Sequence, residues 1–193
     1  MQIETDALIV GAGPVGLFTV FQLGLHGIQA HLVDVLDQAG GQCVELYPDK
    51  PIYDIPAVPV CTGQELTERL LQQIQPFAPR FHFGQQVSRL ERQSDGRWLV
   101  QTTQARRPHQ IFLCRSVIIA AGVGAFVPKD IKIDGLAAFE GRQLFYRHEP
   151  AARFAGRRVV VFGGEDAAVS AALALARPGP LQAASVTLVH RRD

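Results

Sequence analysis

Apolar runs alternate with glycine-rich turns at the start of the chain. Residues 7–10 read Ala-Leu-Ile-Val, a continuous apolar run typical of a strand buried on both faces of a parallel sheet. A helix is predicted from about Pro14, and residues 30–33 read as a second strand. This order of strand, helix and strand predicts a βαβ unit and therefore an α/β fold.

The pattern changes period further along the chain. Thr62 and Glu65 have the spacing of a capping box, and leucines at helical spacing follow until Pro76, so a helix is predicted here. Residues 80–115 then follow period two in the segments RFHFG, QQVSRLER, WLVQTT and HQIFLC, which predicts a small antiparallel meander. Residues 116–121 (SVIIAA) return to the pattern of a parallel strand.

Residues 40–60 follow neither period and contain four prolines, so we expect a long loop. Ordered loops of this length in a compact domain more often bind ligands than merely connect elements. Tyr47 and Tyr53 could supply flat apolar surface there. The alternative is a Pro-rich segment that only covers the sheet.

The last third of the chain is a looser repeat of its start. A change of composition at residues 122–135 predicts the passage into a second module. Residues 158–162 (RVVVF) read as a buried strand, Gly163 and Gly164 follow, and a helix through Ala176 leads to a strand at residues 185–189. We therefore expect one domain at residues 1–121 and part of a second at residues 122–193.

The turn after the first strand has the pattern of a dinucleotide-binding motif. Gly11, Gly13 and Gly16 have the spacing G-x-G-x-x-G, in which the glycines allow a tight turn, close approach of a pyrophosphate, and close packing of helix on strand. The helix N-terminus at Pro14 offers free amide groups and the positive end of a dipole to phosphates. Asp34 ends the second strand about 20 residues later, where a carboxylate can bind a ribose hydroxyl. The unit predicts a dinucleotide site but does not distinguish FAD from NAD.

Composition excludes few functions. A net charge of +1 gives no field that favours nucleic acid or a membrane surface as a partner. The N-terminus carries acidic residues where a signal peptide would be basic, and no apolar run reaches about 18 residues, so we expect a soluble cytoplasmic protein. Cys43, Cys61 and Cys114 form no C-x-x-C motif, so we expect reduced, mostly structural thiols and no metal site.

The two modules, the meander leading into SVIIAAG, and the terminal HRRD resemble the thioredoxin reductases, flavoproteins with two dinucleotide-binding domains. Within that family, GGQCVELYPDKPIYDIPAVPV and AGVGAFVPK are similar to the thioredoxin-reductase-like ferredoxin–NADP reductases, which lack the redox disulfide. The resemblance implies FAD and NADPH as cofactors and ferredoxin or flavodoxin as the electron partner. The flavin carries the chemistry in such an enzyme, so no catalytic side chain is expected.

The resemblance also implies which residues bind the cofactors. Those for FAD are Gly11, Gly13, Pro14, Gly16, Asp34, Gln42, Tyr47, Val87 and Phe126. Those for NADPH are Gly163, Gly164, Arg191 and Arg192. Gln42 and Tyr47 would lie along the flavin and ribityl chain, and the Val87 backbone would meet the adenine. Phe126 would lie beside the cofactor where the chain crosses between domains. The two arginines suit a 2'-phosphate, with a solvated basic chain end as the alternative.

The chain departs from the family pattern in two ways. Glu165 stands where relatives have a glycine, and a carboxylate beside a pyrophosphate opposes binding, so we expect weak NADPH binding that Glu165→Gly strengthens. Family members also continue well beyond HRRD. We therefore expect an N-terminal fragment that is inactive in hydride transfer alone. An uncovered apolar face could lead it to form a homodimer.

Three other functions stay open. A plain NAD-linked dehydrogenase is disfavoured by the lack of a Tyr-x-x-x-Lys pair and by the inserted meander. A disulfide reductase of the thioredoxin reductase type would use Cys43, which follows Gly-Gly-Gln, but no second cysteine stands at motif spacing. A nonenzymatic nucleotide-sensing module is compatible with Glu165 and with the missing C-terminal part.

Overall fold

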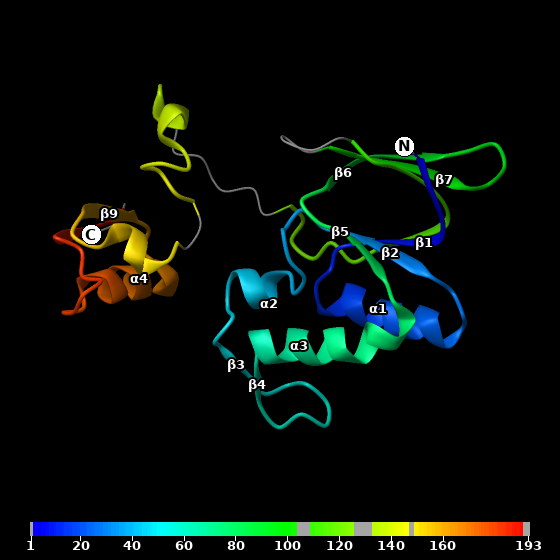
Figure 1. Cartoon of the computed structure of the whole chain (residues 1–193), viewed down its shortest axis with the longest axis horizontal. Coiled ribbons are helices and arrows are strands. Elements are labelled where there is room, and N and C mark those ends of the chain that lie inside the picture. Colours follow the sequence, from blue (N-terminus) through cyan, green and yellow to red (C-terminus); the bar gives the residue numbers. More distant parts are fainter. Residues whose placement is uncertain (1, 104–108, 126–132, 147–148, 191–193) are drawn as a thin grey trace. The chain divides into compact units, whose positions relative to one another are not determined.

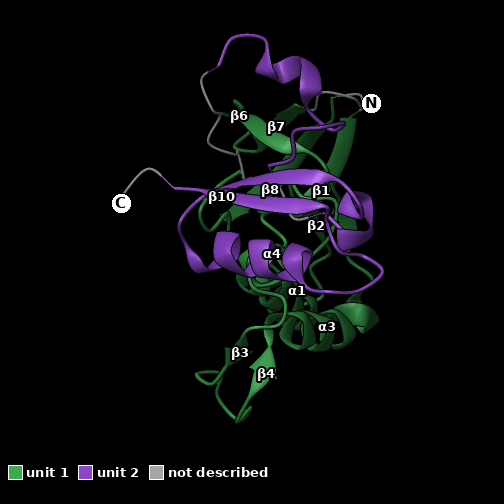
Figure 2. Cartoon of the chain, turned by 90° about the vertical axis from the view of Figure 1, so that its left-hand side faces the viewer, with its two compact units in different colours: residues 1–127 green, residues 128–193 purple. Residues whose placement is uncertain are grey.

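A computed structural model of the chain describes residues 2–103, 109–125, 133–146 and 149–190. The chain divides into two compact units, residues 1–127 and 128–193, coloured separately in Figure 2. Each unit is described by itself. Phe126, Arg191 and Arg192 lie outside the described residues, so their roles stay predictions.

One six-stranded sheet, in the order β5-β2-β1-β8-β7-β6, organises the first unit (Figure 1). Its strands are β1 (Gln2–Val10), β2 (Ala30–Val33), β5 (Arg80–His82), β6 (Gln86–Arg92), β7 (Trp98–Thr103) and β8 (Ile111–Ile119). Strands β5, β2, β1 and β8 pair in parallel, whereas β8, β7 and β6 pair antiparallel. The predicted α/β class, with a Rossmann-like parallel sheet and an antiparallel meander, is confirmed.

The sheet differs from the prediction in how the meander joins it. The segments 109–114 and 116–121, predicted as separate strands, form the single nine-residue strand β8. Its first half pairs with β7 on one side and β1 on the other, and its second half continues along β1. Strand β5, predicted in the meander, pairs in parallel with β2. The predictions of two separate strands in place of β8 and of β5 within the meander were therefore wrong. A period-two pattern indicates which face of a strand is buried but does not identify the neighbouring strand.

Two helices cover one face of the sheet: α1 (Pro14–Leu25) and α3 (Gly63–Ile74) (Figure 1). The buried residues on this face are Ala7, Ile9, Ala12, Leu17, Val20, Ala30, Leu32 and Ile74. The predicted capping box is present: Thr62 Oγ1 accepts from the Glu65 amide at 3.1 Å, and Glu65 Oε2 accepts from the Thr62 amide at 2.9 Å. Helix α3 ends before Pro76, which lies in the 3-10 turn η1 (Gln75–Phe77).

The opposite face has a second cluster, in which Leu8, Val33, Val100, Phe112 and Cys114 are buried. Residues 7 to 9 of β1 therefore face alternately into the two clusters, and all three are fully buried. Burial on both faces explains the continuous apolar run that predicted this strand.

The predicted loop at residues 40–60 contains regular structure. It includes the one-turn helix α2 (Gln42–Glu45) and strand β3 (Pro51–Ile52), which pairs antiparallel with β4 (Cys61–Thr62). Gly40 and Gly41 enter the segment with φ values of +119° and +55°. Elements of two to four residues are too short to show a period, which explains why the sequence pattern missed them.

The second unit contains the parallel pair β9 (Arg158–Phe162) and β10 (Ser185–Val189), with α4 (Asp166–Ala176) between them in sequence. Two 3-10 turns, η2 (Leu136–Phe139) and η3 (Ala151–Phe154), precede β9. The predicted bounds of both strands agree with those observed. Val160 and Phe162, on one face of β9, are 54% and 59% exposed.

Across the described ranges of both units, no helix combines the length and the apolar character needed to span a membrane. The same residues contain no grouping of three or more His, Cys, Asp or Glu side chains suited to a metal ion.

Candidate functional site

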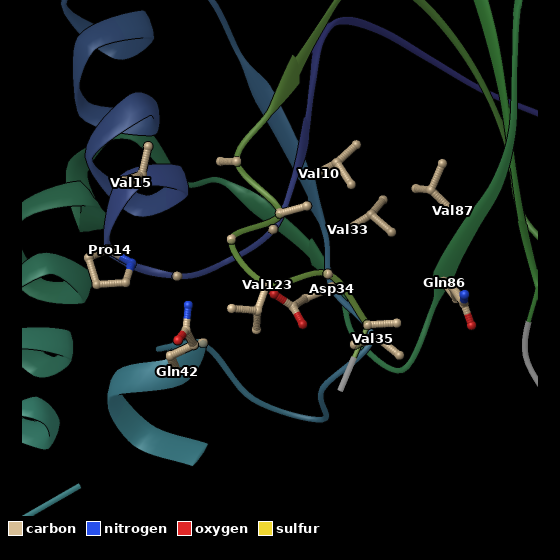
Figure 3. A pocket seen from close by; sticks show the side chains of 18 of the residues that line it. Val10, Pro14, Val15, Val33, Asp34, Val35, Gln42, Gln86, Val87 and Val123 are labelled. Atoms are coloured by element: carbon tan, nitrogen blue, oxygen red, sulfur yellow. The ribbon is translucent and has the colours of Figure 1, made fainter. Parts of the chain in front are cut away.

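A pocket of about 380 Å³ opens in the first unit where the parallel strands β1, β2 and β8 end. Ligands of α/β proteins bind at this edge, because the loops that leave neighbouring strands converge there. Six of the residues predicted for FAD line it: Gly11, Gly13, Pro14, Asp34, Gln42 and Val87. Figure 3 shows Pro14 and Gln42 on one side and Val87 on the other, with Asp34 between them.

The glycine-rich turn closes one side of the pocket. Gly11 has φ +108°, and a Cβ there would overlap the carbonyl of Ala120, which follows β8. A Cβ on Gly16 would overlap the Gly11 carbonyl oxygen, so helix α1 can begin this close to the turn only with glycine. At Gly13, an added Cβ would have only one neighbour within 4 Å, the Cα of Gly41 at 3.8 Å. The backbone of Gly13 is therefore open towards the pocket.

Helix α1 points its N-terminus into the pocket. Gly13 is its N-cap, Pro14 occupies the first turn, and no side chain caps the free amides. The first turn has no acidic residue either. Uncapped amides at the positive end of a twelve-residue helix are suited to an anion such as a pyrophosphate.

Asp34 follows β2 and is fixed by two backbone amides. One carboxylate oxygen accepts from Ala12 at 2.6 Å and the other from Leu36 at 2.8 Å. The carboxylate is thus tied to the glycine-rich turn, and each oxygen retains a lone pair for a further donor. The sequence predicted Asp34 for a ribose, but the bond to Ala12 depends on the pairing of β1 with β2 and was not foreseen.

Tyr47 lines a second, adjoining pocket of about 610 Å³ rather than the first. Gln42 and Cys43 line both pockets. The Lys50 ammonium lies 5.1 Å from the centre of the Tyr47 ring. Tyr53 lines the same pocket and is 70% exposed. The segment therefore presents two aromatic side chains next to the glycine-rich turn's pocket.

The three cysteines are free thiols. Burial, together with the neighbouring Cys61, raises the pKa of Cys43, and burial raises the pKa of Cys114 to about 11. A thiol attacks as its thiolate, so a raised pKa does not suit a nucleophile.

Sequence reasoning missed much of the far wall of the pocket. Gln85 and Gln86 precede Val87 there, and residues 120–125, after β8, form a further side that includes Val123. Gln85 is only 3% exposed. The paired glycines at 122 and 124 were the one available signal for the loop after β8, whereas a buried glutamine has no periodic signature.

Two histidines on the neighbouring strands β2 and β5 lie side by side, His31 buried and His82 half-buried. His31 Nδ1 and His82 Nε2 are 2.9 Å apart, and both rings lie edge-on to Phe112. Burial, then the charges of His82 and Arg80, lower the pKa of His31 to about 4, and burial lowers the pKa of His82. One ring nitrogen must donate and the other accept. The lowered pKa values favour the neutral form of both rings at pH 7.

The second glycine turn lies between β9 and α4. A Cβ on Gly163 would come within 2.9 Å of the Ala168 Cβ, and one on Gly164 would overlap the His190 ring. Glu165 is the N-cap of α4 and makes no side-chain capping bond. Its side chain is exposed at the helix terminus, where the sequence argument placed a pyrophosphate.

Solved structures with the same fold have different activities. A thioredoxin reductase from Lactococcus lactis aligns with a TM-score of 0.65 at 24% identity, over 98% of this chain and 57% of its own. A closed form of cyclohexanone monooxygenase aligns with a TM-score of 0.69 at 24% identity, over 97% of this chain and 38% of its own. Likeness at this identity shows the fold alone.

Curated relatives are far more similar in sequence. The chain is 60% identical over 99% of its length to a ferredoxin–NADP reductase from Albidiferax ferrireducens, covering 53% of that protein. A ferredoxin–NADP reductase from Polaromonas sp. is 59% identical, with 51% of it covered. The predicted resemblance is confirmed, and the chain spans about half the length of these relatives. Residues 49–193 also match a family model, and the chain therefore belongs to the pyridine nucleotide-disulphide oxidoreductase family.

Proposed function

We propose that this chain is part of a flavin-dependent oxidoreductase that passes electrons between NADPH and ferredoxin or flavodoxin through FAD. The observation that carries the proposal is the convergence of the glycine-rich turn, the uncapped N-terminus of α1 and the oriented Asp34 carboxylate on one pocket. Residues 1–121 would bind FAD and residues 122–193 would form part of the NADPH-binding domain. This boundary falls shortly before the division between the two compact units.

The pocket fits the adenosine and pyrophosphate of FAD. The open backbone at Gly13 and the amides of α1 would hold the pyrophosphate, and the free lone pairs of Asp34 would accept from the ribose. Val87 and the other valines that line the pocket offer apolar surface to the adenine. The residues present therefore match each chemical part of the adenosine half.

The adjoining pocket fits the flavin end. Gln42 borders both pockets, and Tyr47 could place its ring against the isoalloxazine. FAD, when bound, supplies the capacity to accept a hydride and release single electrons. The protein would contribute orientation and stacking, which is why no nucleophile or acid–base pair is required of it.

For NADPH, the proposal rests on the turn at Gly163 and Gly164 and on Arg191 and Arg192. The thiols support no second candidate, because burial raises the pKa of both Cys43 and Cys114. A disulfide-reductase function therefore gains nothing from the structure. The homodimer and the cytoplasmic location stay predictions.

Titration with FAD tests the proposal, followed by quenching of flavin fluorescence. We expect saturable binding that Asp34→Ala weakens at least about tenfold, because it removes two charge-assisted hydrogen bonds within the site and the acceptor for the ribose. Tyr47→Ala should weaken FAD binding but leave ADP binding unchanged, since ADP lacks the flavin. If this chain bound neither FAD nor ADP, the proposal would be contradicted.

A further inference from the structure

The pocket wall formed by Gln85, Gln86 and Val87 is held by hydrogen bonds of its first residue, Gln85. The Gln85 amide donates to the Asp34 carbonyl at 2.9 Å, and its side-chain Oε1 accepts from Thr102 Oγ1 at 2.6 Å. Gln85 and Thr102 are 3% and 1% exposed. The first bond ties the wall to the residue proposed to bind the ribose, and the second ties it to β7.

Thr102 is itself held rigidly. Its amide donates to the Gln110 carbonyl at 3.0 Å, and its hydroxyl oxygen accepts from the Gln110 amide at 3.1 Å. Gln110 directly precedes β8, so the hydroxyl connects the pocket wall to the centre of the sheet. Thr102 does not line the pocket itself.

The wall needs such an anchor because it begins an edge strand. Among the described residues, β6 is the last strand of the sheet and pairs with β7 alone. Val87 lies opposite Thr102, and the register shifts between Val87 and Arg89, so regular pairing is interrupted directly after the wall. An edge strand with such an irregularity is held less firmly by its backbone bonds alone.

We propose that Thr102 is a positioning residue for the bound nucleotide, holding Gln86 and Val87 against its adenosine half through the hydrogen bond to Gln85. The inference rests on the proposed function and extends it, since it assigns a role in binding to a buried side chain that does not contact the ligand. The same bonds would equally serve stability alone. A test must therefore separate nucleotide affinity from stability.

Thr102→Val keeps the shape of the side chain and removes the hydroxyl, so Gln85 Oε1 loses this donor. Thr102→Ser restores the hydroxyl and serves as the conservative rescue. Thr67→Val is the matched control: Thr67 is 2% exposed and donates to the Gly63 carbonyl at 3.0 Å, within α3. It removes an equally buried hydroxyl that has no hydrogen bond to the wall.

The experiment measures ADP binding by calorimetry and FAD binding by fluorescence in all variants, with thermal unfolding recorded in parallel. We expect Thr102→Val to weaken ADP and FAD binding about tenfold, and Thr102→Ser and Thr67→Val to change it by less than about twofold. Hydrogen exchange of the ligand-free protein should quicken at residues 85–87 in Thr102→Val but not in Thr67→Val.

Gln85→Met removes the acceptor from the other side and should reproduce the loss of affinity, which keeps the test decisive if Thr102→Val does not fold. Unchanged affinity in Thr102→Val or Gln85→Met, or an equal loss in Thr67→Val, would overturn the positioning role while leaving the proposed function intact. If the parent chain bound neither ADP nor FAD, the proposed function itself would fail, and the positioning role with it.

Discussion

The chain contains the same local pattern twice, a strand, a glycine turn and a helix. The first copy lines a pocket of about 380 Å³, whereas in the described residues the second copy consists of two paired strands and one helix. Around Gly11, neighbouring segments contact the turn: Ala120 packs against it, and the Asp34 carboxylate accepts a hydrogen bond from the Ala12 amide. Around Gly163, the strand belongs to a two-stranded sheet, and the helix that follows carries an exposed Glu165 at its N-cap.

If the first pocket binds a nucleotide as proposed, the difference means that a glycine turn becomes a binding site through its neighbours. The helix dipole and free amides come with any strand–turn–helix, but the ribose acceptor and the walls come from other strands of the sheet. In the first unit four parallel strands bring these parts together. In the second, two strands supply only the turn and the helix.

Alanine in the two turns should reveal this difference most strongly. Gly16→Ala would place its Cβ into the Gly11 carbonyl, which is backbone and cannot move away, so we expect a loss of at least about 3 kcal/mol in the free energy of unfolding. Gly164→Ala would meet the His190 ring, which is a side chain and not backbone, so we expect a smaller loss of about 1 kcal/mol. Urea unfolding measures both.

Trp98, the single tryptophan, lies in β7 and reports on the first unit by its fluorescence, while circular dichroism reports on the whole chain. Equal losses of stability in the two variants would contradict the idea that backbone neighbours lock only the first turn.

Acid should destabilise the first unit through the histidine pair. Burial lowers the folded-state pKa of His31 from 6.5 to about 4 and lowers that of His82, so the unfolded chain binds more protons between these pH values. Stability is therefore full above about pH 6.5 and falls as the pH drops towards 4, by on the order of 2 kcal/mol.

The other groups facing the pair are the Arg80 guanidinium, the Phe112 ring and the Gln110 side chain. His31→Asn keeps a hydrogen-bonding group in place of Nδ1 but does not titrate. It should flatten the dependence of stability on pH, monitored by Trp98 fluorescence. A slope identical to that of the parent would exclude His31 as its source.

Removing the charge at the second turn should have the smallest effect. Glu165→Gly is expected to tighten NADPH binding about three- to tenfold, because solvent screens this exposed carboxylate and reduces its repulsion of the pyrophosphate. Glu165→Gln separates charge from bulk, since it keeps the size of the side chain. NADPH titration measures both variants, and an unchanged dissociation constant in each would mean that Glu165 does not face the nucleotide.

Much of the local structure was predictable from particular residues. Pro14 begins α1, Thr62 and Glu65 cap α3, and the strands at residues 30–33, 158–162 and 185–189 have the predicted bounds. Six of the residues predicted for FAD line the first pocket, while Tyr47 lines the adjoining one and Gly16 packs behind the turn. These features depend on neighbours in sequence or on a motif with a fixed spacing.

The rest depends on contacts between distant residues. No local pattern pairs β5 with β2, joins two predicted strands into β8, or brings His31 next to His82. The Thr102 bond to Gln85 likewise follows from the register of β6 on β7. Such pairings are selected by the packing of the whole sheet, because a strand's own side chains specify its buried face but not its partner.

The sequence by itself therefore determined the βαβ unit, its dinucleotide fingerprint and the family to which the chain belongs, because these depend on spacing along the chain and on similarity to relatives. Only the tertiary structure decided how Asp34 is oriented, which residues form the far wall of the pocket, and that His31 and His82 lie within hydrogen-bonding distance of each other. Those properties depend on burial and hydrogen bonding between strands that are far apart in sequence.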